Sequence, residues 1–273
     1  MTWLDGRAVI VTGAGQGLGR AFAIDAATRG AAVLVNDIDA SLADEVTQII
    51  LARGGRAAPH AASVSRRETA DELIVHCGQA FGRFDGLVNN AGRFLWQDSG
   101  TESQAALQDL VETNVLGALF CGGAAIRHFR STGQGTIVNV SSNAYRGIER
   151  MAAYSATKGA LVSLTYSWAA EFSGTGIRVN CLAPRAATRM SAVRNDTTGW
   201  PAPAQIAPVV SMLLSEQSAP ASGVVLAFDG KLLGRMGRPA QEVLATPGPD
   251  ITADELRAIL AEALGLADGQ IAE

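Results

Sequence analysis

Hydrophobic positions along the chain fall into short β-branched runs that alternate with longer helical patterns. Six apolar runs predict strands, in residues 7–13, 31–37, 84–90, 135–142, 177–184 and 223–230. Helical patterns follow the first three runs, in residues 17–30, 41–55 and 104–130. This βαβ rhythm is typical of a parallel sheet with crossover helices and strands buried on both faces. We therefore expect an α/β fold, a single-domain, doubly wound parallel sheet of seven strands with helices on both faces.

The pattern changes near the C-terminal end of the chain. After about residue 231 the sequence becomes punctuated by proline and glycine, and Thr252 with Glu255 then forms a predicted capping box. We expect one amphipathic helix at about residues 252–264, stopped by Gly265. Residues 1–230 are the predicted catalytic domain, and residues 231–273 are a predicted extension rather than an independent domain.

Composition and charge narrow the classes of function. The chain has 273 residues and a net charge of −4 without a block of like charges, which argues against a nucleic-acid binder or a polybasic membrane surface. Three cysteines are far apart, at Cys77, Cys121 and Cys181, and three histidines are scattered, at His60, His76 and His128. Neither set has the spacing of a disulfide framework or a metal site. With no run of about 18 apolar residues, we expect a soluble cytoplasmic protein without a catalytic metal, whose partners are small molecules.

A glycine-rich stretch, TGAGQGLG in residues 12–19, follows the first strand and opens the first long helix. Its Gly13, Gly17 and Gly19 form a GxxxGxG pattern, which permits a tight turn and lets a pyrophosphate approach the backbone. The helix N-terminus behind it favours an anion. An ordinary strand-to-helix turn would use the same glycines, so this pattern needs support from its context.

Asp37 supplies that context at the end of the second strand. A carboxylate there accepts hydrogen bonds from an adenosine ribose diol and repels a 2′-phosphate. Its expected neighbours Gln16, Ile38 and Asp39 include no basic residue, so the sequence favours NAD over NADP. Asp37 could also cap the turn into the next helix.

Further motifs complete a family pattern. With Asn114, the stretches TGAGQGLG (12–19), NNAG (89–92), VSS (140–142) and YSATK (154–158) resemble the short-chain dehydrogenase/reductase family over about residues 5–230. The resemblance implies a Rossmann-like domain, a nicotinamide cofactor and the interconversion of a secondary alcohol and a ketone. It therefore identifies the chain as an NAD(P)-dependent alcohol dehydrogenase or ketoreductase.

The tyrosine and lysine of YSATK explain this chemistry. A phenol is a poor base near neutral pH unless a nearby positive charge stabilises its anion. Four residues apart on a helix, Tyr154 and Lys158 share one face, and Lys158 is one of only two lysines in the chain. We expect Tyr154 to be the general acid/base, and Lys158 to lower its pKa and hold the cofactor ribose.

The serine of the catalytic set has two candidates. The family's usual separation from the tyrosine selects Ser141, whereas alignment on the strand IVNVSS selects Ser142. We prefer Ser142, because strand register decides which side chain faces the site while loops absorb deletions. Asn114 resembles the family's asparagine that binds a water beside Lys158, and it could equally satisfy buried backbone.

The resemblance also implies the cofactor contacts. They are Gly13, Gln16, Gly17, Leu18, Gly19, Asp37, Ser63, Val64, Asn89, Ala91, Gly92, Tyr154, Lys158, Pro184 and Thr188. Two positions depart from the family pattern. Ser63 stands where an aspartate commonly meets the adenine, and Arg185 follows Pro184 where glycine is usual.

Substrate choice is less constrained by the sequence. The chain looks most like the branch of hydroxyacyl-CoA dehydrogenases of multifunctional-enzyme type and their bacterial single-domain relatives, which implies a 3-hydroxyacyl-CoA or a related CoA-linked alcohol. Six arginines are predicted at the carboxyl edge of the sheet, where they could meet CoA phosphates: Arg93, Arg146, Arg150, Arg185, Arg189 and Arg194. Trp96 and Trp200 could instead line a steroid or cyclic alcohol site.

Two further expectations concern activity and assembly. A catalytically idle NAD-binding sensor or scaffold is the alternative of another class, and the intact set of Asn114, Ser142, Tyr154 and Lys158 argues against it. The family's long helices, here about residues 102–129 and 154–172, commonly form a four-helix interface. The resemblance therefore implies a homotetramer.

Overall fold

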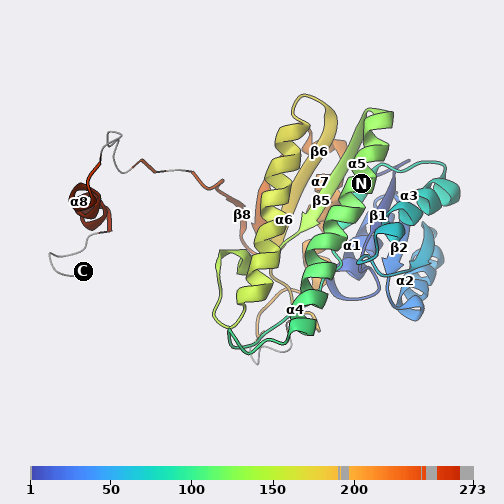
Figure 1. Cartoon of the computed structure of the whole chain (residues 1–273). Coiled ribbons are helices and arrows are strands. Elements are labelled where there is room, and N and C mark those ends of the chain that lie inside the picture. Colours follow the sequence, from blue (N-terminus) through green and yellow to red (C-terminus); the bar gives the residue numbers. More distant parts are fainter. Residues whose placement is uncertain (1, 190, 192–196, 241, 244–250, 265–273) are drawn as a thin grey trace. The chain divides into compact units, whose positions relative to one another are not determined.

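The computed structural model describes residues 2–189, 191, 197–240, 242–243 and 251–264. The residues up to Met236 surround one sheet of eight strands in the order β3-β2-β1-β4-β5-β6-β7-β8 (Figure 1). The strands are β1 (Ala8–Val11), β2 (Ala32–Asp37), β3 (Arg56–Ala61), β4 (Gly86–Asn89), β5 (Gln134–Val140), β6 (Gly176–Pro184), β7 (Val225–Phe228) and β8 (Leu233–Met236). The first seven are parallel, which confirms the predicted doubly wound sheet.

The eighth strand corrects the expected count of seven. It runs antiparallel to β7 after a tight turn, in which Asp229 Oδ1 accepts the N–H groups of Lys231 (3.0 Å) and Leu232 (2.8 Å). Gly230 in this turn has a φ of 86°, which favours glycine. The β8 sequence LGRM has no β-branched residue, so the hydrophobic pattern does not reveal it. The sheet thus continues to Met236, beyond the domain end expected at residue 230.

Strand β3 also lacks an apolar signal. Its sequence RAAPHA carries no β-branched residue, and no position in it is fully buried. It pairs with β2 over its whole length and forms the edge of the sheet, where Pro59 is tolerated because one side has no ladder to complete. Pairing with β2, rather than burial, therefore defines this strand.

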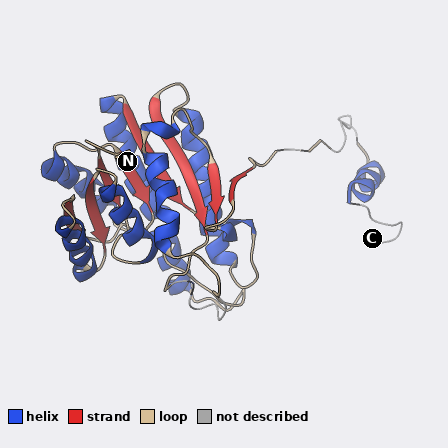
Figure 2. Ribbon diagram, turned by 180° about the vertical axis from the view of Figure 1, so that it is seen from behind, coloured by secondary structure: helices blue, strands red, loops and turns tan. Residues whose placement is uncertain are grey.

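Helices cover both faces of the sheet (Figure 2). They are α1 (Gly17–Thr28), α2 (Ala40–Ala52), α3 (Arg67–Phe81), α4 (Gln104–Val111), α5 (Gly117–Thr132), α6 (Ala152–Glu171) and α7 (Pro203–Leu214). Val9 and Val11 of β1 pack with α1, α2 and α7, whereas Ala8 and Ile10 pack with α3, α5 and α6. This strict alternation along one strand produces two apolar layers and explains the continuous hydrophobic runs of the strands.

The helical stretch Gln104–Thr132 is long and apolar enough, by length and composition, to cross a membrane. Half of its most apolar window is buried inside the protein, and Ala125 and Phe129 of α5 are fully buried against the core. These contacts are those of a core helix lying on a sheet. Its apolar character is therefore accounted for by packing.

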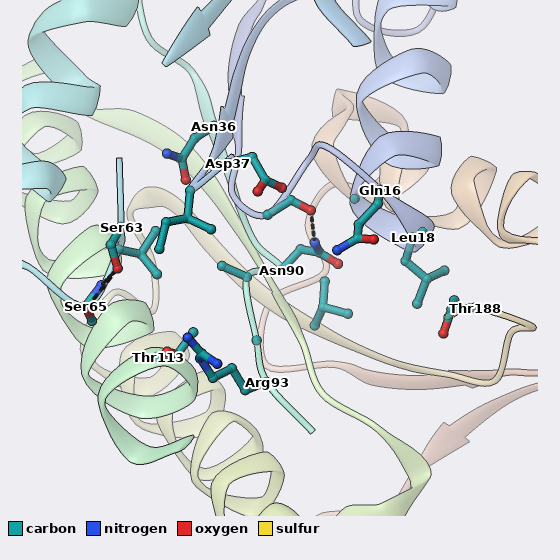
Figure 3. A pocket seen from close by; sticks show the side chains of 18 of the residues that line it. Gln16, Leu18, Asn36, Asp37, Ser63, Ser65, Asn90, Arg93, Thr113 and Thr188 are labelled. Carbon is teal, nitrogen blue, oxygen red and sulfur yellow. Dashed lines mark hydrogen bonds between the residues drawn. The ribbon is translucent and has the colours of Figure 1, made fainter. Parts of the chain in front are cut away.

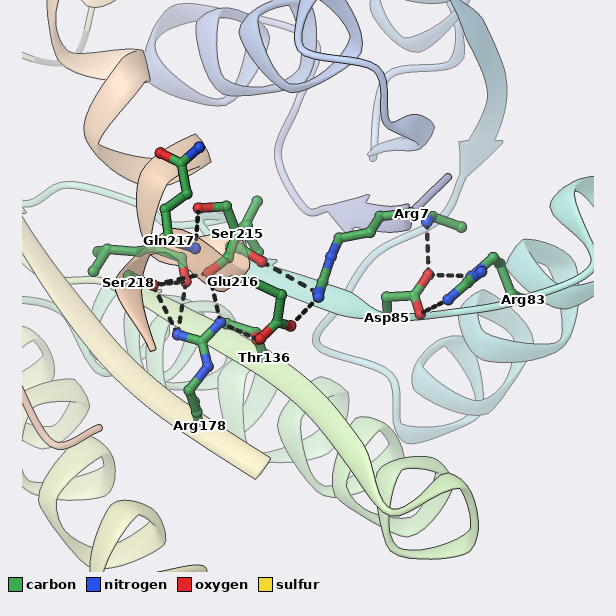
Figure 4. Close-up of polar contacts among 12 residues, drawn as sticks. Arg7, Arg83, Asp85, Thr136, Arg178, Ser215, Glu216, Gln217 and Ser218 are labelled. Carbon is green, nitrogen blue, oxygen red and sulfur yellow. Dashed lines mark hydrogen bonds and ion pairs between the residues drawn. The ribbon is translucent and has the colours of Figure 1, made fainter. Parts of the chain in front are cut away.

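A polar network closes the amino ends of the central strands, opposite the site described below (Figure 4). The buried guanidinium of Arg178 on β6 donates to the carbonyls of Leu213 and Ser215 and to the hydroxyls of Thr136 and Ser218. Beside it, Arg7 pairs with Glu216, and Asp85 accepts from Arg83 (2.7 Å) and from the Ala8 N–H (2.8 Å). These contacts anchor the loops at that end.

Residues after Met236 form a separate unit. Its helix α8 (Ala253–Leu264) begins with a capping box, in which Glu255 accepts the Thr252 N–H (2.8 Å) and Thr252 accepts the Glu255 N–H (3.2 Å). The helix bounds agree with the expected 252–264. Gly265, the expected stop, lies outside the described residues.

Candidate active site

A cavity of about 400 Å³ opens at the carboxyl ends of the parallel strands (Figure 3). Its lining includes Gly13, Gln16, Gly17, Leu18, Gly19, Asp37, Ser63, Val64, Ala91, Gly92, Tyr154, Lys158 and Thr188 from the expected cofactor set. Asn36, Ser65, Asn90, Arg93 and Thr113 are further members. Residues distant in the sequence thus meet at the edge where such sheets bind ligands.

Glycines of the 12–19 loop are required by close approaches of the backbone. A Cβ on Gly13, whose φ is 60°, would lie 2.7 Å from Ala91 Cα. On Gly19 it would lie 2.1 Å from the Gly13 carbonyl oxygen. Gln16 begins α1 in an extended conformation without a side-chain cap, so the first amides of α1 remain available to an anion.

Asn90 and Thr12 join the two loops of this cavity, and the sequence did not single them out. The Asn90 amide donates to the carbonyls of Thr12 (2.9 Å) and Gly13 (3.0 Å). In return, Thr12 Oγ1 accepts the N–H groups of Asn90 and Ala91, both at 3.0 Å. Asn89, expected among the cofactor contacts, donates to the Ala118 carbonyl on α5 and to Asn139 Oδ1 on β5 and does not line the cavity. In the sequence, the only signal for Asn90 was its place directly after Asn89 in the NNAG motif.

Asp37 lines the cavity at the end of β2. Its Oδ2 accepts the Gly15 N–H (2.8 Å) and its Oδ1 accepts the Asp39 N–H (3.1 Å), so the carboxylate is fixed against the glycine loop. Ile38, 68% exposed, follows it along the lining. Asp37 thus lies in the cavity wall, and its contact with a ribose stays a prediction.

Neutral residues line the cavity at Ser63 and Val64, the positions that the sequence predicts for adenine binding. Ser63 and Ser65 exchange a hydroxyl hydrogen bond of 2.8 Å, and Val64 is buried. Gly117 at the start of α5 makes room for Val64, because a Cβ there would lie 2.7 Å from Val64 Cγ2. The backbone and small side chains thus shape this part of the cavity.

Tyr154 and Lys158 lie one turn apart on α6, as predicted. Lys158 Nζ donates to the Val140 carbonyl (2.8 Å) and lies 5.7 Å from the centroid of the Tyr154 ring. Burial lowers the pKa of Lys158 to about 8. Burial also raises the pKa of Tyr154 to about 12, partly opposed by a hydrogen bond with Ser142. In the protein without ligand the phenol is therefore protonated at neutral pH.

The two serine candidates have different partners. The Ser141 hydroxyl is buried and donates to the Lys158 carbonyl at 2.7 Å, so it holds β5 to α6. Ser142 begins the 3-10 helix η2 (Asn143–Arg146), accepts the Ala144 N–H (3.2 Å) and reaches the Tyr154 hydroxyl. Of the two hydroxyls, that of Ser142 is the one beside the phenol.

Asn114 lies in a five-residue π-helix, η1 (Glu112–Leu116), between α4 and α5. Its Oδ1 accepts the Arg93 N–H (2.7 Å), and its Nδ2 donates to the Arg93 carbonyl and to Thr157 Oγ1, both at 3.0 Å. A Cβ on Gly92 would lie 3.2 Å from Asn114 Oδ1 and 3.5 Å from Lys158 Nζ. Asn114 thus fixes the loop next to the lysine, and π-helices often occur at functional sites.

A second cavity, of about 120 Å³, adjoins the first on the other side of Tyr154. Its apolar lining is Leu18, Phe94, Ala144, Ile148, Met151, Pro184, Ala186 and Trp200, and its polar lining is Ser141, Ser142, Asn143, Tyr154, Arg185, Thr188 and Ser191. Tyr154 and Thr188 border both cavities, whereas Pro184 borders only this one. The hydroxyls of Tyr154 and Ser142 thus face a small, mostly apolar chamber.

The six arginines predicted at this edge separate into groups. Arg93 pairs with Asp109 (2.9 Å), Arg150 pairs with Asp98 (2.8 Å), and Arg189 donates to Gln16 Oε1 (2.9 Å). Arg146 is exposed on η2, and Arg194 lies outside the described residues. Arg185 lines the second cavity. The arginines therefore do not form one patch.

Comparison with known proteins decides the family. Residues 7–199 match the short chain dehydrogenase family. The chain belongs to this family. Among curated relatives, it is 33% identical to 2-(S)-hydroxypropyl-CoM dehydrogenase 3 of Xanthobacter autotrophicus, over 83% of this chain and 96% of that protein.

Two further similarities agree. The chain is 34% identical to (2S)-[(R)-hydroxy(phenyl)methyl]succinyl-CoA dehydrogenase subunit BbsD of Thauera aromatica, over 66% of this chain and 73% of that protein. A crystal structure of a short chain dehydrogenase from Mycobacterium avium matches with a TM-score of 0.88 and 33% identity, over 97% of each chain. The protein is thus an oxidoreductase of the dehydrogenase type.

Within the described residues, His, Cys, Asp and Glu form no group of three that could hold a metal.

Proposed function

We propose that the protein is an NAD-dependent oxidoreductase that interconverts a secondary alcohol and a ketone. One observation carries this proposal: Tyr154 borders both the cavity of about 400 Å³ and the small apolar chamber, with Ser142 beside it in the chamber and Lys158 Nζ 5.7 Å from its ring centroid. A substrate oxygen held by both hydroxyls would present its carbon toward the first cavity. When bound there, a nicotinamide cofactor supplies the hydride acceptor or donor.

In this proposal Tyr154 exchanges the proton of the substrate oxygen and Ser142 orients that oxygen. Lys158 has a pKa of about 8, so its ammonium is charged at neutral pH and favours the phenolate when Tyr154 must act as a base. The pKa of about 12 for Tyr154 suits proton donation to a ketone, and alcohol oxidation requires that value to fall in the loaded site. Asn114 would position the loop beside Lys158.

The preference for NAD over NADP is part of the proposal. Asp37 is held at the cavity wall by two backbone N–H groups, and Ile38 offers no positive charge for a 2′-phosphate. The basic side chains that line the cavity have other partners: Arg93 contacts Asp109, Arg189 contacts Gln16, and Lys158 donates to the Val140 carbonyl. A carboxylate without a basic neighbour disfavours a phosphorylated ribose.

For the substrate, we propose a CoA-linked secondary alcohol such as a 3-hydroxyacyl-CoA as the first candidate. The name of the Thauera aromatica relative, a dehydrogenase of (2S)-[(R)-hydroxy(phenyl)methyl]succinyl-CoA, supports it. A cyclic or steroid alcohol is the second candidate, supported by Phe94 and Trp200 in the wall of the chamber. The small chamber favours a short chain or a single ring at the reacting carbon.

An idle NAD-binding sensor or scaffold would require a missing acid/base group or a blocked chamber. Ser142 is hydrogen-bonded to Tyr154, and Lys158 Nζ lies 5.7 Å from the centroid of the Tyr154 ring. A cavity of about 120 Å³ remains beside Tyr154 and Ser142 for a substrate. We therefore favour the enzyme. A cytoplasmic homotetramer, formed through the helices in about residues 102–129 and 154–172, completes the proposal and can be checked by light scattering.

The proposal is tested by NADH formation with a panel of secondary alcohols, with and without a CoA group, in the wild type and in Tyr154→Phe. We expect activity with NAD and a loss of at least about 100-fold in kcat in the variant. NADH binding by Tyr154→Phe at the wild-type affinity controls for folding. Wild-type binding of NADH without turnover of any alcohol would favour the idle binder.

A further inference from the structure

We propose that Arg185 makes the enzyme selective for secondary alcohols that carry a carboxylate within short reach of the reacting carbon. This inference rests on the proposed reaction, the NAD-dependent interconversion of a secondary alcohol and a ketone, and it ranks a free hydroxy acid above the CoA-linked alcohol that was named as the first candidate. It concerns an anionic group inside the second cavity, as distinct from the phosphates of CoA, which a longer linker would place outside it.

The position of Arg185 is fixed by the sheet. It directly follows Pro184, the last residue of β6, and its N–H donates to the Phe228 carbonyl at the end of β7 (2.9 Å). The guanidinium lies over the Trp200 ring, 5.1 Å from the ring centroid. Backbone pairing and cation–π stacking together restrict the side chain to the wall of the cavity that Tyr154 and Ser142 also line.

The charge of Arg185 is isolated in this cavity. Among the described residues that line it, Arg185 carries the only formal charge, and the rest are apolar or neutral polar. Arg93 and Arg150 at the same edge have carboxylate partners within 4.0 Å, whereas Arg185 has no such ion pair in the described part of the chain. A neutral substrate would therefore cover a guanidinium without pairing it.

Asp229, which the charge of Arg185 reaches, does not fill this role. Asp229 feels the charge of Arg185, which contributes to lowering the pKa of that carboxyl, after the larger effect of hydrogen bonds from the Leu232 and Lys231 backbone. Its Oδ1 is already occupied by those N–H groups, and Asp229 is not part of the cavity lining. A substrate carboxylate would thus meet Arg185 from inside the chamber without displacing Asp229.

The chemistry of the pair indicates a carboxylate at short range. Arg185 is an exposed residue of the cavity wall, and a guanidinium binds a carboxylate through two parallel hydrogen bonds that fix its orientation. The chamber of about 120 Å³ has room for a short chain or one ring between this anion and the hydroxyls of Tyr154 and Ser142. Short or alicyclic hydroxy acids therefore fit better than a long neutral chain.

The test compares matched substrates in the wild type, Arg185→Met and Arg185→Lys. The substrates are 3-hydroxycyclohexanecarboxylate, its primary amide, and the CoA thioester of the same acid. We expect the wild type to favour the free acid over the amide by about 10- to 100-fold in kcat/KM. Arg185→Met should lose this factor on the acid and change less than about threefold on the amide, and Arg185→Lys should recover part of it. The matched control is Lys231→Met, which removes a cation that lies next to Asp229 and does not line the cavity. This variant should behave as the wild type.

Binding gives an independent readout. Cyclohexanecarboxylate and its amide are titrated by calorimetry into the protein–NADH complex, and the acid should bind about 10- to 100-fold more tightly in the wild type only. Equal affinity for the acid and the amide would overturn the inference. Equal losses of kcat/KM on the acid and the amide in Arg185→Met would also overturn it. So would a higher kcat/KM for the CoA thioester than for the acid, if Arg185→Met left that preference unchanged. Failure of the wild type to bind NADH would instead contradict the proposed function.

Discussion

Replacing Lys158 by methionine should stabilise the protein while removing its activity. Lys158 is 4% exposed, and its Nζ donates a hydrogen bond to the Val140 carbonyl. Within the described part of the chain, no carboxylate lies within ion-pair distance of this Nζ. Its pKa falls from 10.5 to about 8. At about 1.4 kcal/mol per pKa unit, the charged form destabilises the fold by about 3 kcal/mol at neutral pH. Loss of the hydrogen bond to Val140 offsets about 1 to 2 kcal/mol of the gain.

We therefore expect Lys158→Met to raise the free energy of unfolding at pH 7 by about 1 to 2 kcal/mol. Activity with any alcohol should fall by at least about 100-fold, because the charge that favours the phenolate is gone. A functional site that is less stable than its apolar substitute would explain both effects.

The pH dependence sharpens this test. Below pH 8 the ammonium is charged in both the folded and the unfolded protein, so the destabilisation is complete. Between pH 8 and 10.5 the folded protein loses the proton first, and the wild type gains stability as the pH rises. The advantage of Lys158→Met should thus shrink by about 2 kcal/mol between about pH 7 and about pH 9.5 in urea unfolding. A difference between the two proteins that is the same at both pH values would refute this reasoning.

Four other substitutions test separate parts of the site. Asp37→Ala should reduce the ratio of kcat/KM for NAD over NADP by about 10-fold or more, measured with one alcohol, whereas an unchanged ratio would remove the basis of the NAD preference. Ser142→Ala should lower kcat by about 100-fold with little change in melting temperature, and Ser141→Ala should instead lower the melting temperature through its bond to α6 while retaining more activity. Gly19→Ala should weaken NADH binding by at least about 10-fold by calorimetry, because the new Cβ would lie 2.1 Å from the Gly13 carbonyl oxygen; wild-type affinity would contradict the tight turn.

The sequence was sufficient to predict the parallel sheet, because strands that are buried on both faces appear as continuous apolar runs. It missed β3 and β8, since RAAPHA and LGRM are defined by pairing with a neighbouring strand rather than by their own burial. The turn chemistry at Asp229 and Gly230 was the remaining signal for β8.

At the site, motif spacing was enough to bring Tyr154 and Lys158 together, because four residues on a helix fix their relation. It placed Asn89 among the cofactor contacts and did not single out Asn90, the residue after β4 that lines the cavity. Nor could it distinguish the six arginines at the edge, because pairing with Asp109 and Asp98 is a tertiary property.

The most direct test of the account is the transfer of hydride from a secondary alcohol to NAD by the purified protein. A hydroxy acid labelled with deuterium at the carbinol carbon is incubated with NAD, and the reduced cofactor is analysed by mass spectrometry for wild type and Tyr154→Phe. We predict deuterated NADH from the wild type and almost none from the variant, although both bind NADH. Equal amounts of deuterated NADH from the two proteins would contradict the assigned role of Tyr154, and its absence from both would contradict the proposed reaction.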